Sequence, residues 1–247
     1  MTEIQSLARG LKILELLGMS QKGTSITELA EILGVDKGSA SRLVSTLVNH
    51  GYAEKDHISR RYVLGSQVVA LSRSLLTRLP LREAAKPSLQ QLMERTGECA
   101  HLAILAQGNA LYIDQVESPA TLRVNVQVGQ MAPLHCTALG KILLAFSNVE
   151  FPAMLESFTP KTITNPDALR KHLEDIRQQG FAVDTEEFDS GIRCIAVPVY
   201  DIRNKVVGAM GISGPATRIT PERLPELIAT VVEIGKALSG RMTSAHS

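Results

Sequence analysis

The stretch SITELAEILGVDKGSASRLVSTLVNHG, residues 25–51, decides how the amino-terminal part of the chain folds. Ser25 and Glu28 have the spacing of a capping box, which marks the start of a short helix, and Gly34 is placed to end that helix. Asp36 can then cap a second helix, which Gly51 ends. Two short helices joined by so tight a turn are typical of a helix-turn-helix.

The second helix of this motif has an outer face that suits contact with DNA. Its inward residues are apolar, whereas its outward residues are polar or basic and include no acidic side chain. In a helix-turn-helix this helix lies in the major groove, where Arg, Lys, Ser and Thr contact phosphates and base edges. The expected DNA-binding residues on it are Lys37, Ser39, Ser41, Arg42 and Thr46.

A basic hairpin is expected directly after the second helix. Residues 52–55 and 62–64 have strand character, and the turn between them contains Arg60 and Arg61. Such a hairpin is a wing, and its two arginines are expected to hold the DNA backbone beside the groove. An apolar repeat over residues 4–17 predicts a further helix before the motif. The alternative interpretation is a small helical packing module with a solvated polar surface.

A connecting helix is expected over residues 66–79, and Pro80 is expected to end it. Its apolar residues recur at helical spacing, at Val68, Leu71, Leu75 and Leu79. This stripe has nothing in its own small domain to bury against, so it is expected either to pair with the same helix of a second subunit or to pack on the larger domain. The predicted organisation is a DNA-binding domain over 1–65, a linker helix over 66–80 and a larger domain over 81–247.

The composition fits a folded protein with reduced thiols. The chain has 247 residues, 44% of them hydrophobic, and 26 Lys and Arg against 25 Asp and Glu, which excludes disorder and a disulfide scaffold. Residues 1–80 carry ten basic and seven acidic side chains, a modest excess that fits a nucleic-acid contact. The three cysteines lie far apart, without a common zinc spacing. Because the sequence has neither a long apolar run nor a leader, a cytoplasmic location without membrane contact is expected.

The remainder of the chain predicts an α+β domain with an antiparallel sheet. The expected helices cover residues 83–96, 137–146, 166–179 and the segment that follows Thr220. The expected strands cover residues 100–106, 111–116, 122–128, 181–183, 195–200 and 206–212. Gln107, Gly108 and Asn109 form a hairpin turn between the first two strands, which makes this part of the sheet antiparallel.

Three polar stretches in this domain are candidates for one binding site. Residues 129–141 run from a loop into a helix whose free backbone N–H groups attract anions, and Gly140 would let a ligand approach them. In the alternative, Gly140 permits close helix packing and Thr137 simply caps the helix. Cys194 lies where an acidic loop returns to an apolar strand, and Ser213 lies at the end of the last strand. Hydroxyl, thiol, carboxylate and helix terminus could therefore converge on one small ligand.

The order of these pieces resembles the IclR family of bacterial transcriptional regulators over essentially the whole chain. The pieces that carry the resemblance are the winged helix, residues 51–65, the stretch Pro133–Lys141, Glu186–Glu187 with Gly191–Ala196, and Ile212–Pro215. The resemblance implies a GAF-like effector-binding domain, dimers joined through the front end and often tetramers. It also implies DNA binding that is altered by a small carboxylic acid or an aromatic metabolite, and it favours a repressor over an activator.

The resemblance also implies which residues hold the effector. By position, the family's pocket maps onto Leu134, Leu139, Gly140, Asp184, Cys194 and Ser213, with apolar walls from Val126, Met131 and Ile192. A position near Gly211 that can carry a hydroxyl in relatives is glycine here, so the ligand can differ from the glyoxylate and pyruvate type. The expected mechanism is two-state: the effector binds one dimer arrangement better than the other, and the connecting helix transmits the difference.

Two other classes of function compete with this interpretation. A thiol enzyme would use the adjacent His135 and Cys136, or His101 and Cys99, which lie two residues apart. Consecutive side chains on an extended segment point to opposite faces, however, and no orienting group is evident. A metal or redox sensor would keep the winged helix and use His101, His135, Cys136 or Cys194 as ligands. We expect no enzyme activity, no cofactor and no metal.

Overall fold

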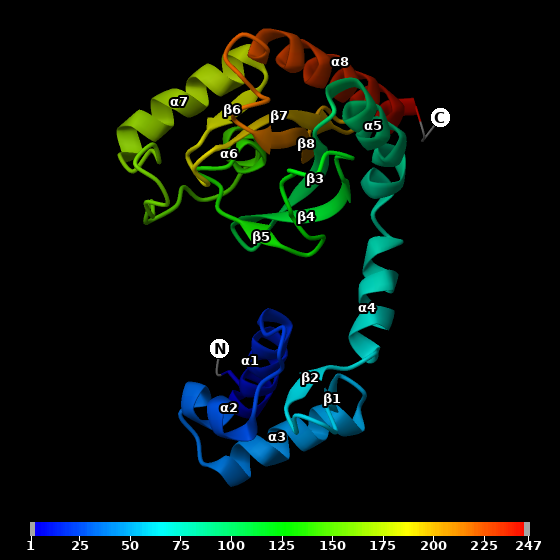
Figure 1. The fold of residues 1–247 in the computed structure, drawn as a ribbon, viewed down its shortest axis with the longest axis vertical. Coiled ribbons are helices and arrows are strands. Elements are labelled where there is room, and N and C mark those ends of the chain that lie inside the picture. The colour runs from blue at the N-terminus through cyan, green and yellow to red at the C-terminus, as the bar shows by residue number, and fades with distance from the viewer. Residues whose placement is uncertain (1–2, 245–247) are drawn as a thin grey trace. The chain divides into compact units, whose positions relative to one another are not determined.

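The computed structural model describes residues 3–244, and the chain divides into two compact units, Met1–Arg78 and Leu79–Ser247 (Figure 1). The outer ends of the expected domains, residues 1–2 and 245–247, lie outside the described part. The first unit contains the helix-turn-helix, the wing and the connecting helix. The finer division at residues 65 and 80 remains a prediction.

The first unit is a winged helix-turn-helix, as predicted. Its elements are α1 (Gln5–Met19), α2 (Ile26–Leu33), α3 (Lys37–Asn49), β1 (Ala53–Lys55), β2 (Tyr62–Leu64) and α4 (Gln67–Leu76). The capping box forms: the Ser25 hydroxyl accepts from the Glu28 N–H, and the Glu28 carboxylate accepts from the Ser25 N–H at 2.7 Å. Gly34 ends α2 with a left-handed conformation at φ 63°, and the Asp36 carboxylate caps α3 by accepting from the Ser39 N–H.

A small apolar core holds these elements together. Its fully buried residues are Ile13, Leu17, Leu29, Val44 and Ala53. Other apolar side chains of α1, Leu7 and Leu11, remain 60% and 55% exposed, so the repeat that predicts the helix coincides with the buried stripe only toward its end, at Leu17. No side chain of α4 is buried within the chain.

The expectation that Pro80 ends the connecting helix is wrong. Helix α4 already ends at Leu76, and Pro80 is the first residue of the next helix, α5 (Pro80–Thr96). Proline suits that position because the first helical residue has no intrahelical partner for an N–H, and its fixed φ matches the helix. A proline after a helical repeat can therefore mark a beginning as well as an end.

The second unit is an α+β domain built on a six-stranded sheet in the order β5-β4-β3-β8-β7-β6, in which all neighbours are antiparallel. The strands are β3 (Cys99–Ala106), β4 (Asn109–Val116), β5 (Met131–Ala132), β6 (Ala182–Thr185), β7 (Ile192–Tyr200) and β8 (Val206–Pro215). The remaining helices are α6 (Ala138–Phe146), α7 (Pro166–Gln179) and α8 (Leu224–Ser244). Among the described residues, none of the helices is both long and apolar enough to cross a bilayer.

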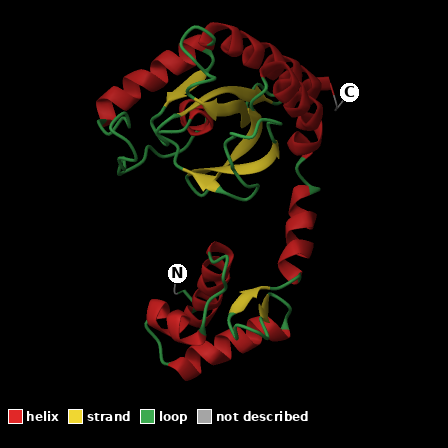
Figure 2. Cartoon of the chain, in the orientation of Figure 1, coloured by secondary structure: helices red, strands yellow, loops and turns green. Residues whose placement is uncertain are grey.

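The helices form two layers, one on each face of the sheet (Figures 1 and 2). Helices α5 and α8 lie side by side and bury one face together with residues such as Leu102, Val197 and Met210. Helices α6 and α7 cover the other face, where the sheet presents small side chains such as Ala196 and Ala209. Small residues let α6 approach the sheet closely, and the strand ends beyond this contact are left to form a site.

The strand expected over residues 122–128 does not form. In this segment half-buried Val124 and Val126 alternate with exposed residues, but none of the described strands pairs with its backbone. It is held instead by single hydrogen bonds, including those from the Arg218 guanidinium to the Leu122 carbonyl and from the Cys99 thiol to the Val124 carbonyl. We call residues 122–128 the strap, because it passes over the site described next.

Candidate effector cavity and DNA-contact surface

Three of the five expected DNA-contact residues of α3, Ser39, Arg42 and Thr46, lie in a connected chain of polar groups. The Asp36 carboxylate accepts from the Ser39 hydroxyl at 2.6 Å, and the Ser39 hydroxyl accepts from the Arg42 guanidinium at 3.0 Å. The hydroxyl of Thr46 donates to the Arg42 carbonyl at 3.0 Å. Lys37, Arg42 and Thr46 are exposed, whereas Ser39 and Ser41 are half-buried. The start of α3 therefore presents arranged donors to its surroundings.

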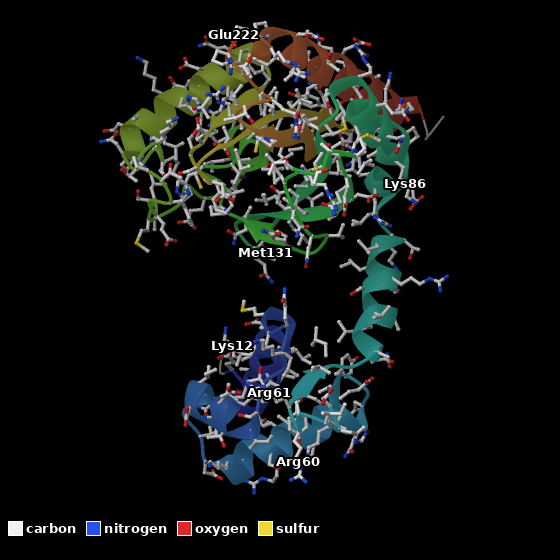
Figure 3. The ribbon with its side chains drawn as sticks, viewed as in Figure 1. Lys12, Arg60, Arg61, Lys86, Met131 and Glu222 are labelled. Carbon is white, nitrogen blue, oxygen red and sulfur yellow. The ribbon has the colours of Figure 1, made fainter. Side chains whose placement is uncertain are left out.

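The two wing arginines have different surroundings (Figure 3). Arg60 is exposed and lies in the turn with a left-handed backbone at φ 59°. Arg61 instead binds both carboxylate oxygens of Glu28 at 2.7 and 2.6 Å and the Gly23 carbonyl at 3.0 Å. These bonds, with the capping bonds of Ser25, lower the pKa of Glu28 to about 2. Arg61 thus ties the wing to α2, and its expected contact with DNA stays a prediction.

A cavity of about 80 Å³ lies in the second unit, on the sheet face that α6 covers. Its lining residues come from the strap and the loop that follows it, from the start of α6, from the loop between β6 and β7, and from all six strands of the sheet. They are His101, Tyr112, Val124, Asn125, Val126, Gln130, Ala132, Thr137, Ala138, Leu139, Asp184, Phe188, Asp189, Ile192, Cys194, Ile195, Ile212 and Ser213. At roughly 10–15 Å³ for each water-sized group, the cavity has room for about half a dozen such groups.

The polar side of the cavity is a row of residues across the sheet. Strand register places Asp184 of β6 opposite Cys194 of β7, Cys194 opposite Ser213 of β8, and Ser213 opposite Cys99 of β3. Register partners in an antiparallel sheet point to the same face, so these four side chains share one side. The first three of them line the cavity.

The structure brings together six of the nine expected effector-binding residues and leaves three outside the cavity. Those that line it are Val126, Leu139, Asp184, Ile192, Cys194 and Ser213. Met131 is 42% exposed on the edge strand β5 (Figure 3), and Leu134 is buried in the core between α6 and the sheet. Their apolar character suits these places without any ligand.

Gly140 is also outside the cavity, and its absent side chain serves packing. A Cβ there would lie 2.5 Å from the Pro133 carbonyl oxygen and 2.5 Å from the Thr137 hydroxyl. That hydroxyl caps α6 by accepting from the Gly140 N–H at 3.1 Å and donates to the Pro133 carbonyl at 2.8 Å. The geometry therefore favours the alternative in which Thr137 caps the helix and Gly140 permits close packing. The two residues between them, Ala138 and Leu139, do line the cavity.

His101, which the sequence indicates only as a candidate of the two rival classes of site, lines the cavity. Its Nε2 atom lies 2.6 Å from the Ser213 hydroxyl, and its ring meets Tyr112 edge-on with 5.6 Å between ring centres. Burial lowers the pKa of His101 to about 4, so the ring is neutral near pH 7. The alternation of β3 could have indicated this placement, since His101 follows Cys99 by two residues on the same face.

Burial also sets the protonation of the other cavity groups. It raises the pKa of Asp184 to about 7, against the lowering effect of the Glu187 N–H, which the Asp184 carboxyl accepts at 2.7 Å. It raises the pKa of the Cys194 thiol well above its usual range, with the neighbouring Asp184 adding to the shift. Near pH 7 the cavity wall therefore holds a neutral thiol and a carboxyl group that is partly ionised.

A buried ion pair fixes the loop between β6 and β7 to α6. Lys141 is fully buried, and its ammonium group donates to the Glu187 carboxylate at 2.6 Å and to the Val183 carbonyl at 2.7 Å. Its third contact is the Nε2 atom of His172 on α7, at 3.2 Å. An ammonium group has three N–H donors, so this set satisfies it completely.

The rival chemistries find little support in this geometry. Burial raises the pKa of the Cys136 thiol to about 12, and the ring of His135 bonds the Glu156 carbonyl rather than the thiol. A thiol of that kind is a poor nucleophile at neutral pH. Within residues 3–244, no three or more His, Cys, Asp or Glu side chains gather as a metal-binding group.

Comparison with known families matches both units of the chain. Residues 6–57 match the family described as the IclR helix-turn-helix domain. Residues 73–240 match the family described as the bacterial transcriptional regulator IclR C-terminal domain. The two matches include α3 and every residue that lines the cavity.

Individual relatives agree with these matches along nearly the whole chain. The HTH-type transcriptional regulator XynR of Escherichia coli is 33% identical over 96% of both chains, and the transcriptional repressor IclR of the same organism is 31% identical over 96% of this chain and 89% of that protein. An IclR homologue from Microbacterium hydrocarbonoxydans, solved with 4-hydroxybenzoate, has the same fold, with a TM-score of 0.83, 22% identity and coverage of 97% of this chain and 100% of that one. These relatives are transcriptional regulators and not enzymes. With its helix-turn-helix and its C-terminal effector domain, the chain belongs to the IclR family of DNA-binding bacterial transcriptional regulators.

Proposed function

We propose that the chain represses transcription from an operator that it binds through α3 and the wing, and that a small monocarboxylic acid in the cavity changes this binding. The observation that carries the proposal is the row Asp184–Cys194–Ser213 on the wall of a cavity. A carboxyl, a thiol and a hydroxyl that converge within an otherwise mostly apolar space are what a small polar ligand requires.

The size of the cavity narrows the ligand class. Space for about half a dozen water-sized groups suits a short aliphatic hydroxy or keto acid. The relative solved with 4-hydroxybenzoate extends the class to aromatic acids, which would require the strap to move outward. The strap lacks strand pairing, so its displacement breaks only a few single hydrogen bonds.

The DNA contacts follow from the exposed groups of the first unit. We assign base and phosphate contacts in the major groove to Lys37, Ser39, Ser41, Arg42 and Thr46, and a backbone contact to Arg60. Two copies of the chain, paired through the exposed apolar side chains of α4, would present two α3 helices to two half-sites.

The proposal is tested on the full chain in two steps. A thermal-shift screen with lactate, glycerate, pyruvate and 4-hydroxybenzoate is expected to raise the Tm with at least one acid, because a ligand that binds only the folded state stabilises it. Fluorescence anisotropy with an operator fragment selected from random DNA should then show a changed Kd when that acid is added. A folded protein that binds its operator but responds to none of the four acids would refute the effector part.

A further inference from the structure

The side chains that line the effector cavity are acidic or uncharged, which limits the ways in which the cavity can hold an acid. Among the described residues that line it, none is Lys or Arg, whereas Asp184 and Asp189 both bring carboxyl groups. An anion placed in a small enclosed space needs a compensating positive charge or strong hydrogen-bond donors. The wall of this cavity supplies no fixed positive side chain.

The nearest buried cation is not free to serve as a partner. Lys141 is absent from the cavity lining, and its three donors are taken by Glu187, the Val183 carbonyl and His172. Turning Lys141 toward a ligand would leave the Glu187 carboxylate buried without its ion pair. That cost is several kcal/mol in comparable cases, so Lys141 stays where it is.

The other groups that face Asp184 are neutral or already paired. Cys194 lies opposite Asp184 in the strand register, and the pKa values of Cys194, Cys136 and Tyr112 are all raised by burial, so these groups stay protonated. Burial holds the pKa of His101 at about 4, which leaves its ring uncharged. Burial also lowers the pKa of His172, with help from Lys141. Of the remaining carboxylates, that of Glu187 is paired with Lys141, and Asp189 is exposed.

Asp184 is thus the group that can change its charge when an anion enters. Its side chain is only 2% exposed, and burial raises its pKa to about 7. We propose that the cavity takes up a monocarboxylate together with one proton, which Asp184 carries and donates to the bound ligand. This inference rests on the proposed function and specifies the chemistry of its ligand: an acid bound as an anion against a neutral carboxyl group.

The physical basis is a carboxyl–carboxylate hydrogen bond. An O–H donor and a carboxylate acceptor form a short, charge-assisted bond, roughly twice as strong as a neutral one. The same pair with both groups ionised would place two negative charges in contact inside the cavity. Uptake of one proton removes that repulsion and turns Asp184 from an acceptor into a donor.

The inference predicts a specific pH dependence. Below about pH 6.5 Asp184 already carries its proton in the free protein, so the Kd for an acid should hardly change with pH. Above pH 7 the proton must be taken from solvent, and the Kd should rise by about tenfold for each pH unit. The acids used as probes are ionised throughout this range, so their own titration does not contribute.

The experiment is isothermal titration calorimetry on the full chain between pH 6.0 and 8.5. The ligand is whichever of lactate, glycerate, pyruvate and 4-hydroxybenzoate binds most tightly, and each pH is measured in two buffers of different ionisation enthalpy. The difference between the buffers counts the protons taken up. We expect the uptake of close to one proton for each bound ligand at pH 8 and of far less than one at pH 6.

Variants identify the group that carries the proton. Asp184→Asn keeps a hydrogen-bond donor without a titrating group, so it should bind the acid with a Kd that varies less than twofold over this range and take up no proton. Asp189→Asn should retain the proton uptake of the wild type. Asp167→Asn, which removes an exposed carboxylate on α7, is the control for a change in overall charge.

The outcomes separate this inference from the proposed function. An acid that binds with no proton uptake, or with uptake lost in Asp189→Asn but kept in Asp184→Asn, would overturn the inference and leave an acid-responsive regulator. Preferential binding of the primary amide of the same acid would also overturn it. If none of the four acids binds, both the inference and the proposed effector class fall.

Discussion

At the residue scale, Arg42 is the side chain on which DNA recognition is expected to depend most. It is exposed on α3 and bonds the Ser39 hydroxyl, so part of its rotamer entropy is already lost before DNA binds. Arg42→Ala should weaken operator binding by about 1–3 kcal/mol if the guanidinium reads a base edge. Fluorescence anisotropy at fixed salt measures this loss.

A matched control separates recognition from net charge. Arg170→Ala removes an exposed arginine of α7, in the other unit, and should change operator affinity far less. Equal losses in the two variants would show that Arg42 acts only through long-range charge. A loss that is uniform over all DNA sequences would instead assign Arg42 to phosphate contact.

Lys141 is predicted to be the most sensitive single charge in the effector domain. Lys141→Met would leave the buried Glu187 carboxylate with no ion pair, and such a loss costs about 3–5 kcal/mol. The double variant Lys141→Met with Glu187→Gln removes both charges and should recover a large part of that stability. Urea denaturation followed by circular dichroism tests the coupling, and losses that simply add would contradict it.

His101 is predicted to make the domain sensitive to acid. Its folded pKa of about 4 lies below the usual value of 6.5, so its contribution to stability is complete above pH 6.5 and is lost as the pH falls toward 4. His101→Gln lacks this titration. As the pH falls through this window, the free energy of unfolding of the variant should therefore increase relative to that of the wild type by up to about 1.4 kcal/mol for each pH unit. A difference that stays constant from pH 7 to pH 4 would contradict the burial of a neutral ring.

At the element scale, the start of α6 depends on the absence of one side chain. Gly140→Ala would push a Cβ against the Pro133 carbonyl and the Thr137 hydroxyl that caps the helix. We expect a loss of about 1–3 kcal/mol, which combines overpacking with damage to the cap. Gly240→Ala, at an exposed position of α8 where the added Cβ would meet no described atom within 4 Å outside the neighbouring helix backbone, is the control and should be neutral or slightly stabilising. Thermal unfolding of both variants makes the comparison.

Most elements could be predicted because local signals and tertiary packing agree. The capping box at Ser25 and the hairpin turn at Gln107–Gly108, where both residues have positive φ, form as the sequence indicates. The strap shows where such signals fail. Apolar and polar residues alternate along the strap with the period of a strand. A segment that turns one side toward a cavity shows the same alternation, although no strand pairs with it. The two-residue strand β5 is too short to leave a pattern.

The cavity could be predicted only in part, since a site is a tertiary arrangement. Asp184, Cys194 and Ser213 belong to motifs, and the family resemblance indicated them. His101 and Tyr112 lie on strands that read as ordinary core, and they reach the cavity only because of the order β4-β3-β8-β7-β6. The place of Gly140, outside the cavity lining, could not be predicted, because a glycine near a ligand and a glycine under a helix cap look alike in sequence.

At the scale of the whole molecule, the apolar side chains left uncovered on α4 indicate how two chains would join. Leu71 and Leu75 are 52% and 59% exposed and lie four residues apart, on one face of the helix. Burial of such a face against its copy in a second chain would remove apolar area from water and pair the two DNA-binding units. The double variant Leu71→Gln with Leu75→Gln should therefore weaken the dimer that we propose.

The consequences of that variant differ between the two functions of the chain. One α3 helix can contact only one half-site, so loss of the dimer should move operator binding to concentrations at least tenfold higher. The effector cavity lies wholly within the second unit, so the Kd for the acid should stay within about twofold of the wild type. Sedimentation velocity, anisotropy and calorimetry measure the three quantities, with Ala70→Gln, on another face of the same helix, as the control. An unchanged sedimentation coefficient with unchanged operator affinity would show that α4 does not join the chains.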